Sequence, residues 1–322
     1  MKKILPVLIM ISMIWVGCGD SRNQNDDISE LLKLIENDEM LKLDLLDEGG
    51  ALDEEYTDGI EDGGGYKIMA DTLWPNSNYR LRFGRQILNH ERDVSFDIQD
   101  DTAYADISRS ISGNFFVVAF DSNHTMVDSF VKAFDSDFYR RVRFTRNDSS
   151  SNRPWRINAF TIGTGVSGSK VNITSLACYD TNTGDTLYSY SANDAGDVFI
   201  LRSDVPTFAP RDQVRIEISV TNEEPVFSVD SLDSGEKAIL NFGRERGERA
   251  RRRFNDSGLF GDETAGDNIF TMLWRVHGIH PNHGNRRVFN THFDVIDNAT
   301  LFIRDGGYNV AVWSIPYRIV RP

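Results

Sequence analysis

The stretch Val214-Arg215-Ile216-Glu217-Ile218-Ser219-Val220 decides the fold class of this chain. Apolar side chains occupy every second position of the stretch, and polar side chains occupy the positions between them. Because successive side chains of a strand point to opposite faces of its sheet, this pattern predicts an antiparallel strand with one buried face and one wet face.

Similar short apolar segments surround this stretch between residue 155 and the end of the chain. We predict strands over Trp155–Ile162, Lys170–Tyr179, Thr186–Ser191, Val198–Leu201, Gln213–Thr221, Lys237–Phe242, Ile269–Val276, Arg287–Ile296, Thr300–Ile303 and Val310–Ile319. Many short strands separated by Gly, Asn and Asp turns are typical of β-sandwiches. We therefore predict an Ig-like antiparallel β-sandwich region over 155–322, either undivided or split into two subdomains near residue 205.

Residues 72–147 predict a smaller α+β domain. Tyr79, Phe83 and Ile87 share one face at helical spacing, which predicts a short helix that Asn76 or Ser77 caps. On either side of a predicted turn at 99–101, apolar residues then occupy every second position, which is the spacing of strands. Further strands are predicted over Ile111–Phe120 and Tyr139–Thr145, so the whole chain is expected to be mainly β.

The first residues predict a signal peptide over 1–17. Lys2 and Lys3 precede a 13-residue apolar segment, Ile4 to Val16, which is too short to span a bilayer. The sequence then reaches Gly17-Cys18 and resembles a bacterial lipoprotein signal, although Trp15 stands where Leu is usual. The resemblance implies that Cys18 is lipidated and holds the protein at a membrane of the cell envelope, with the outer membrane or cell surface favoured. The alternative is an ordinary secretory peptide that is cut nearby.

The negative charge of the chain is concentrated directly after this signal. Residues 18–72 contain 17 acidic and 4 basic residues, a balance of −13 out of a net charge of −14 for the whole chain. We predict that residues 18–71 form an acidic tether that contains an amphipathic helix over about Asp27 to Asn37 and a Gly-rich linker. The apolar stripe of this helix is expected to dock on the body of the same chain.

The segment 255–270 carries the most chemical information. Asp256, Asp262 and Asp267 recur among glycines directly before a predicted strand, with Glu263 as a further carboxylate. Ca²⁺ prefers six to eight oxygen ligands from carboxylates and backbone carbonyls. We predict a Ca²⁺ site at these aspartates. The alternative is a loop whose aspartates cap its own backbone without any metal.

This loop resembles one in Ig-like domains of secreted bacterial proteins, including the choice-of-anchor group. Asp256, Gly258, Gly261, Asp262, Gly266 and Asp267 follow the pattern of that loop, which precedes a strand. The chain departs from the pattern at Asn268, where Gly is usual, and at Phe270, where Tyr is usual. The resemblance implies a sandwich fold and, less directly, an adhesion-type function.

Two other residue sets contain potential metal or redox chemistry. His277, His280, His283 and His292 cluster after the acidic loop, and we considered a zinc site with His277 and His280 as its better ligands. An exposed loop is the usual structure of such a stretch. Cys178, which is the single thiol after Cys18, cannot form an internal disulfide and is expected to be a small buried hydrophobe.

The sequence contains no Gly-x-Ser-x-Gly, P-loop or HExxH motif. We therefore predict that the protein is not an enzyme and binds or scaffolds another envelope component, a protein or a glycan. An acidic chain that has neither aromatic residues placed to stack on bases nor a known nucleic-acid-binding module is not expected to bind nucleic acid. The first alternative is a carbohydrate-binding module that uses Trp274, Trp313 or Tyr317. The second is a hydrolase whose catalytic residues are dispersed along the chain.

Overall fold

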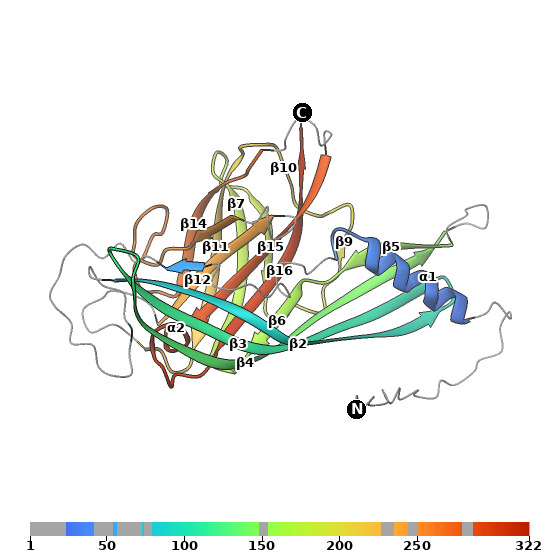
Figure 1. Cartoon of the computed structure of the whole chain (residues 1–322). Coiled ribbons are helices and arrows are strands. Elements are labelled where there is room, and N and C mark those ends of the chain that lie inside the picture. Colours follow the sequence, from blue (N-terminus) through green and yellow to red (C-terminus); the bar gives the residue numbers. More distant parts are fainter. Residues whose placement is uncertain are drawn as a thin grey trace, which may run out of the picture.

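The computed structural model of the chain is mainly β, as the alternating patterns predict. It describes residues 24–41, 54–56, 73, 79–147, 154–226, 235–243, 250–278 and 286–321. Figure 1 shows long curved strands that run through most of the molecule, a second layer of strands over part of them, and the helix α1 (Gln24–Asn37) near the ends of the long strands beside β5 (Trp155–Phe160). The predicted signal peptide and Cys18 lie outside the described residues.

A large sheet forms the frame. Its longest strands are β2 (Tyr79–Gln99), β3 (Thr102–Asp121) and β4 (Met126–Arg146), which pair antiparallel in chain order. The other strands of this sheet are β1 (Glu54–Tyr56), β5 (Trp155–Phe160), β6 (Gly163–Ser167), β9 (Ile200–Leu201), β10 (Thr207–Phe208), β12 (Glu236–Gly243), β13 (Ala250–Arg253), β15 (Arg286–Asp297) and β16 (Val310–Val320). The main strand order among the described residues is β1-β2-β3-β4-β6-β16-β15-β12-β13.

A smaller sheet packs on part of the large one. Its order is β14-β11-β7-β8, with β7 (Val171–Asp180), β8 (Thr186–Ser191), β11 (Gln213–Asn222) and β14 (Ile269–Arg275). On β11, Val214, Ile216 and Ile218 are buried, as their alternation predicts, and join a core with β15 and β16. The two layers therefore form a β-sandwich-like core that covers only part of the large sheet.

The N-terminal helix α1 (Gln24–Asn37) docks on the body, as predicted. Leu31 and Ile35 are buried in the same apolar cluster as Trp155 and Ile157 beside β5. Arg146 Nη2 lies 3.0 Å from Asp27 Oδ2, and Asp38 pairs with Arg202. Part of the acidic N-terminal segment is thus neutralised by arginines of the body, and does not serve only as a solvated tether.

Arg140 connects the chain after α1 to the large sheet. It is buried, and its guanidinium donates to Met40 O at 3.1 Å and to Ser314 O at 2.9 Å. Burial lowers the pKa of Arg140 to about 10. A Cβ at Gly163 would lie 2.6 Å from Arg140 Nη2, so β6 needs glycine beside this side chain.

The helix predicted from Asn76 or Ser77 to Ile87 is wrong. Residues 79–87 belong to β2, where Leu81 and Phe83 are buried and alternate with Arg80 and Arg82. Helical and alternating spacings coexist in this short segment, and pairing with β3 decides between them. The alternating segment that follows the turn at 99–101 and the strand predicted over Ile111–Phe120 are parts of one strand, β3.

The strand predicted over Thr300–Ile303 is also wrong. These residues lie largely in the short helix α2 (Asn298–Phe302). The buried Lys132 Nζ donates to Ala299 O at 2.7 Å and to Thr300 O at 2.9 Å, and Ala299 O also accepts from Ile303 N at 3.2 Å at the end of the helix. Lys132 lies on β4, so a contact distant in sequence stabilises this turn of helix.

The large sheet continues across the domain boundary predicted at 147–155. β4 pairs with both β5 and β6, and β6 pairs with β16. Strands on the two sides of residue 205 likewise share the small sheet, since β7 pairs with β11. The predicted divisions therefore do not coincide with breaks in hydrogen-bonded structure. None of the helices in the described ranges is long and apolar enough to cross a membrane.

Candidate functional site

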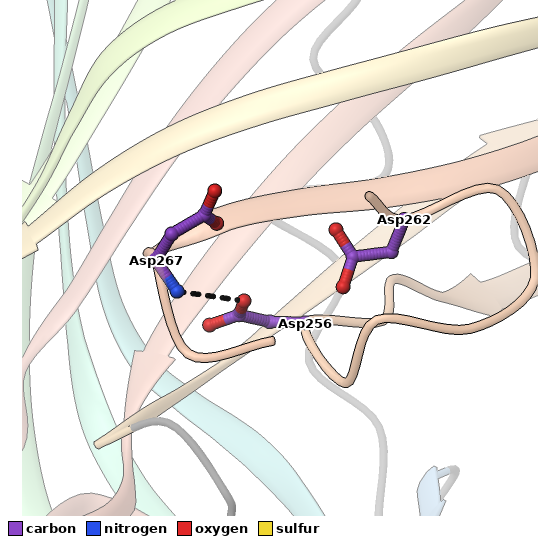
Figure 2. A group of neighbouring side chains, drawn as sticks. All are labelled: Asp256, Asp262 and Asp267. Atoms are coloured by element: carbon purple, nitrogen blue, oxygen red, sulfur yellow. Dashed lines mark hydrogen bonds between the residues drawn. The ribbon is translucent and has the colours of Figure 1, made fainter. Parts of the chain in front are cut away.

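The three aspartates of the predicted Ca²⁺ site lie close to one another. Figure 2 shows Asp256, Asp262 and Asp267 converging from different points of one loop. One carboxylate oxygen from each lies within 4.8 Å of the others, and this is the one potential metal-ligating group found among the described residues. Oxygens bound to one Ca²⁺ at about 2.3–2.6 Å lie at most about 5 Å apart, so the spacing suits this ion.

Asp256 organises the backbone of the loop. Its Oδ1 accepts from Gly266 N at 2.9 Å and from Asp267 N at 3.2 Å, and its Oδ2 accepts from Asn268 N at 3.3 Å. Asp256 therefore caps the backbone of its own loop, as the metal-free alternative predicts. These donors also hold the carboxylate in a fixed orientation.

Asp262 and Asp267 each use one oxygen for the backbone. Asp262 Oδ2 accepts from Gly258 N at 2.6 Å, and Asp267 Oδ1 accepts from Ile269 N at 3.0 Å. The second oxygen of each carboxylate accepts no hydrogen bond from the described part of the chain. Glu263 lies outside the cluster, because it pairs with Arg215 at 3.2 Å.

The backbone explains the departure at Asn268 from the resembling loops. Asn268 has a φ of +62°, a conformation that glycine adopts freely and that Asn adopts more readily than most residues. The change from Gly to Asn therefore keeps the turn. Gly266, at +71°, supplies the N–H that Asp256 accepts.

A row of buried carboxylates continues from this loop into the sandwich. Glu236 of β12 pairs in register with Asp297 of β15, and Asn222 Nδ2 lies 3.0 Å from Glu236 Oε2 and 3.4 Å from Asp297 Oδ1. Phe254 N donates to Ala238 O, which continues the β12–β13 pairing toward Glu236 and Asp256. The members of this row are distant in sequence, so no local pattern indicates it.

Burial is the main cause of the raised pKa values of Asp256, Glu236 and Asp297. The neighbouring charges of Asp256 and Asp297 raise the pKa of Glu236 further. Since the folded state holds these protons more tightly than the unfolded state, the groups stabilise the fold at acid pH. That contribution is lost as pH rises through the folded pKa values.

We expect Glu236→Gln to raise stability at pH 7.5 by about 1–2 kcal/mol, because it removes a charge from a side chain that is only 1% exposed. Near pH 4 the difference from wild type is expected to shrink, since Glu236 is then protonated. Chemical denaturation at both pH values in chelator measures the effect, with exposed Glu223→Gln as the control. A difference that is equal at both pH values contradicts the assignment.

The histidines do not converge in the described structure. His277 Nε2 lies 2.8 Å from Tyr317 Oη, and its ring contacts Phe242 and Phe289. His292 is buried within β15. His280 and His283 lie outside the described residues, so the zinc hypothesis stays a prediction. Cys178 is buried, and burial raises the pKa of its thiol to about 12.

The aromatic residues proposed as a sugar platform belong to the core. Trp274, Trp313 and Tyr317 are each 5% exposed or less. The rings of Trp274 and Tyr317 pack edge-to-face with centroids 5.3 Å apart. These residues therefore do not form an exposed stacking surface, because the two sheets close over them.

A surface cavity of about 350 Å³ lies elsewhere, where the small sheet ends. Its lining comes from β3, β4, β6, β7 and β16, and includes Ser108, Asp137, Tyr139, Val166 and Asn172. No local signal distinguishes these residues, since they are brought together only by strand pairing.

No protein-family model matches this chain, and no curated protein matches its sequence. Proposals about its function therefore rest on the residues and their geometry.

Proposed function

We propose that this chain is a non-catalytic binding module of the cell envelope, anchored by a lipid on Cys18, in which loop 256–267 binds Ca²⁺. The observation that carries the proposal is the convergence of Asp256, Asp262 and Asp267 within 4.8 Å. Their mutual repulsion is a cost of folding that a divalent cation relieves.

The tip of the same loop supports a role in binding. Leu259 and Phe260 are exposed, and the Phe260 side chain is 80% exposed. Phe260 also has a φ of +52°, which is unfavourable for an aromatic residue. An exposed aromatic residue in a strained turn destabilises the free protein. We infer that Phe260 is exposed because it contacts a binding partner.

The position of α1 limits the distance between Cys18 and the folded body. Only residues 19–23 separate Cys18 from Gln24, where the docked helix begins. Five residues span at most about 18 Å when fully extended. If Cys18 is lipidated, the acidic segment is not a long stalk, and the body lies close to the membrane surface.

Calcium is expected to stabilise the full chain, purified in a non-sugar detergent. Ca²⁺ at about a hundred times its dissociation constant adds about 2.7 kcal/mol to the native state. Thermal melts in excess Ca²⁺ and in chelator measure this difference. Asp262→Asn and Asp267→Asn are expected to abolish it.

Glu263→Gln is the matched control, because Glu263 belongs to the same loop but pairs with Arg215. This variant is expected to keep the whole calcium effect. Identical melts with and without Ca²⁺ would overturn the metal assignment. Release of the full chain into the soluble fraction on Cys18→Ala tests the anchor separately.

Carbohydrate binding is the second candidate function. Trp274, Trp313 and Tyr317 are buried, but Trp313 also lines the cavity beside the small sheet. In that cavity Tyr139 and Val166 supply the exposed surface that favours this function.

A further inference from the structure

The cavity lies over four neighbouring strands of the large sheet, β3, β4, β6 and β16. Pairing in register joins β3, β4, β6 and β16 at two adjacent levels. One row is Ser108, Tyr139, Thr164 and Trp313, and the other is Ser110, Asp137, Val166 and Ala311. Directly paired side chains point to the same face of an antiparallel sheet. The two rows therefore form one continuous surface.

This surface ends at a wall. Tyr139 on β4 and Val166 on β6 are exposed, whereas Ala311 and Trp313 on β16 are buried under the small sheet. Asn172 and Ile173 of β7 line the cavity at this step. A ligand lying on β4 and β6 thus has a floor on the large sheet and a side wall from the small sheet.

The floor combines apolar surface with fixed hydrogen-bonding groups. Tyr139 Oη donates to Asp106 Oδ1 at 2.5 Å, and Arg141 Nε lies 2.9 Å from the same oxygen. Ser110 Oγ donates to Asp137 Oδ1 at 2.6 Å. These contacts orient the Tyr139 ring and the Asp137 carboxylate before a ligand arrives, which lowers the entropy cost of binding.

The cavity is poorly suited to an extended peptide or an ion. β6 is paired with β4 on one side and with β16 on the other, so its backbone offers no free edge for strand addition. Asp137 is the lining residue that presents a charge on the cavity face, because Arg109 lies between Ser108 and Ser110 on β3 and so points to the opposite face of the sheet. A single carboxylate that already accepts from Ser110 Oγ disfavours an anion and supplies too few ligands to hold a metal ion. The volume lies near the lower end of the about 300–1,000 Å³ typical of small-molecule sites.

We propose that this cavity binds a short neutral oligosaccharide, with one or two sugar rings on the Tyr139–Val166 floor. A sugar ring has an apolar C–H face for such a floor and a rim of hydroxyls for groups such as Asp137, Asn172 and Ser108. The inference names the ligand class of the proposed binding function, and it does not depend on the calcium loop.

Isothermal titration of the full chain with cellotetraose, maltotetraose, chitotetraose and xylotetraose tests the proposal. The chain is kept in a non-sugar detergent, because a glycosidic detergent would compete for the site. Val166→Arg fills the cavity from an exposed position, and Val131→Arg is the matched control on an exposed valine of β4. Asn172→Ala removes an amide from the wall.

At least one tetrasaccharide is expected to bind wild type and Val131→Arg equally. Val166→Arg is expected to lose binding, and Asn172→Ala to weaken it by about tenfold, the loss of about one hydrogen bond. Failure of all four sugars to bind wild type, or equal binding by Val166→Arg, would overturn the inference. Neither result would affect the calcium melts or the Cys18→Ala fractionation, which decide the proposed function separately.

Discussion

Trp155→Ala is expected to destabilise the protein by about 3–5 kcal/mol, the usual cost of removing a buried Trp. The Trp155 side chain is 1% exposed, and Arg146 lies over its ring at 4.3 Å. Its Nε1 donates to Asp27 Oδ1 at 2.8 Å, so the same side chain fills the core and holds α1. The melting temperature should fall by about 10 °C.

Trp155→Phe separates these two roles. It keeps an aromatic ring but loses the bond to Asp27, and is expected to cost about 1–2 kcal/mol. Thermal melts give the stabilities, and limited tryptic cleavage at the exposed Lys33 reports release of α1. If Trp155→Ala melts within a degree or two of wild type, Trp155 does not anchor the helix.

Gly165→Ala is expected to cost about 3 kcal/mol through overpacking. Gly165 pairs in register with Phe138, and an added Cβ would overlap the Phe138 ring. The same Cβ would lie 3.3 Å from Val312 Cβ on the other neighbouring strand. Phe138 is buried in a tightly packed cluster, so its ring has little space to move.

Gly278→Ala is the control, since nothing lies within 4 Å of its added Cβ. We expect it to melt like wild type. The double variant Gly165→Ala with Phe138→Leu should cost less than the sum of its two single changes, because the smaller side chain relieves the overlap. A Gly165→Ala melt equal to that of Gly278→Ala would show that β6 tolerates a side chain here.

Local pattern was sufficient for most of the strands between residues 155 and 322. The alternation at 214–220 predicted β11, and the segment 310–319 predicted β16, because strands with one or two buried faces leave such patterns. The helix at Asp27–Asn37 was predicted to within a few residues of α1. These elements have consistent signals over seven or more residues.

Local pattern failed where two structures fit the same residues. Tyr79, Phe83 and Ile87 have helical spacing, but Leu81 and Phe83 alternate with arginines and pair with β3. Thr300 to Ile303 has strand-forming residues, but Lys132 from β4 binds the helical carbonyls of Ala299 and Thr300. In both cases a partner distant in sequence decides the structure.

The sequence by itself determined the mainly β class, the docking helix and the convergence of Asp256, Asp262 and Asp267. Each of these has a signal in residues close together in the chain, whose spacing and backbone preferences act locally, although the contacts that hold the helix come from distant residues such as Arg146 and Trp155. Only the tertiary structure decided that Glu236 and Asp297 are neighbours, that Trp313 is buried, and that a cavity lies beside Tyr139. These features arise from the register between strands, because pairing brings together residues that the sequence separates by up to about two hundred positions.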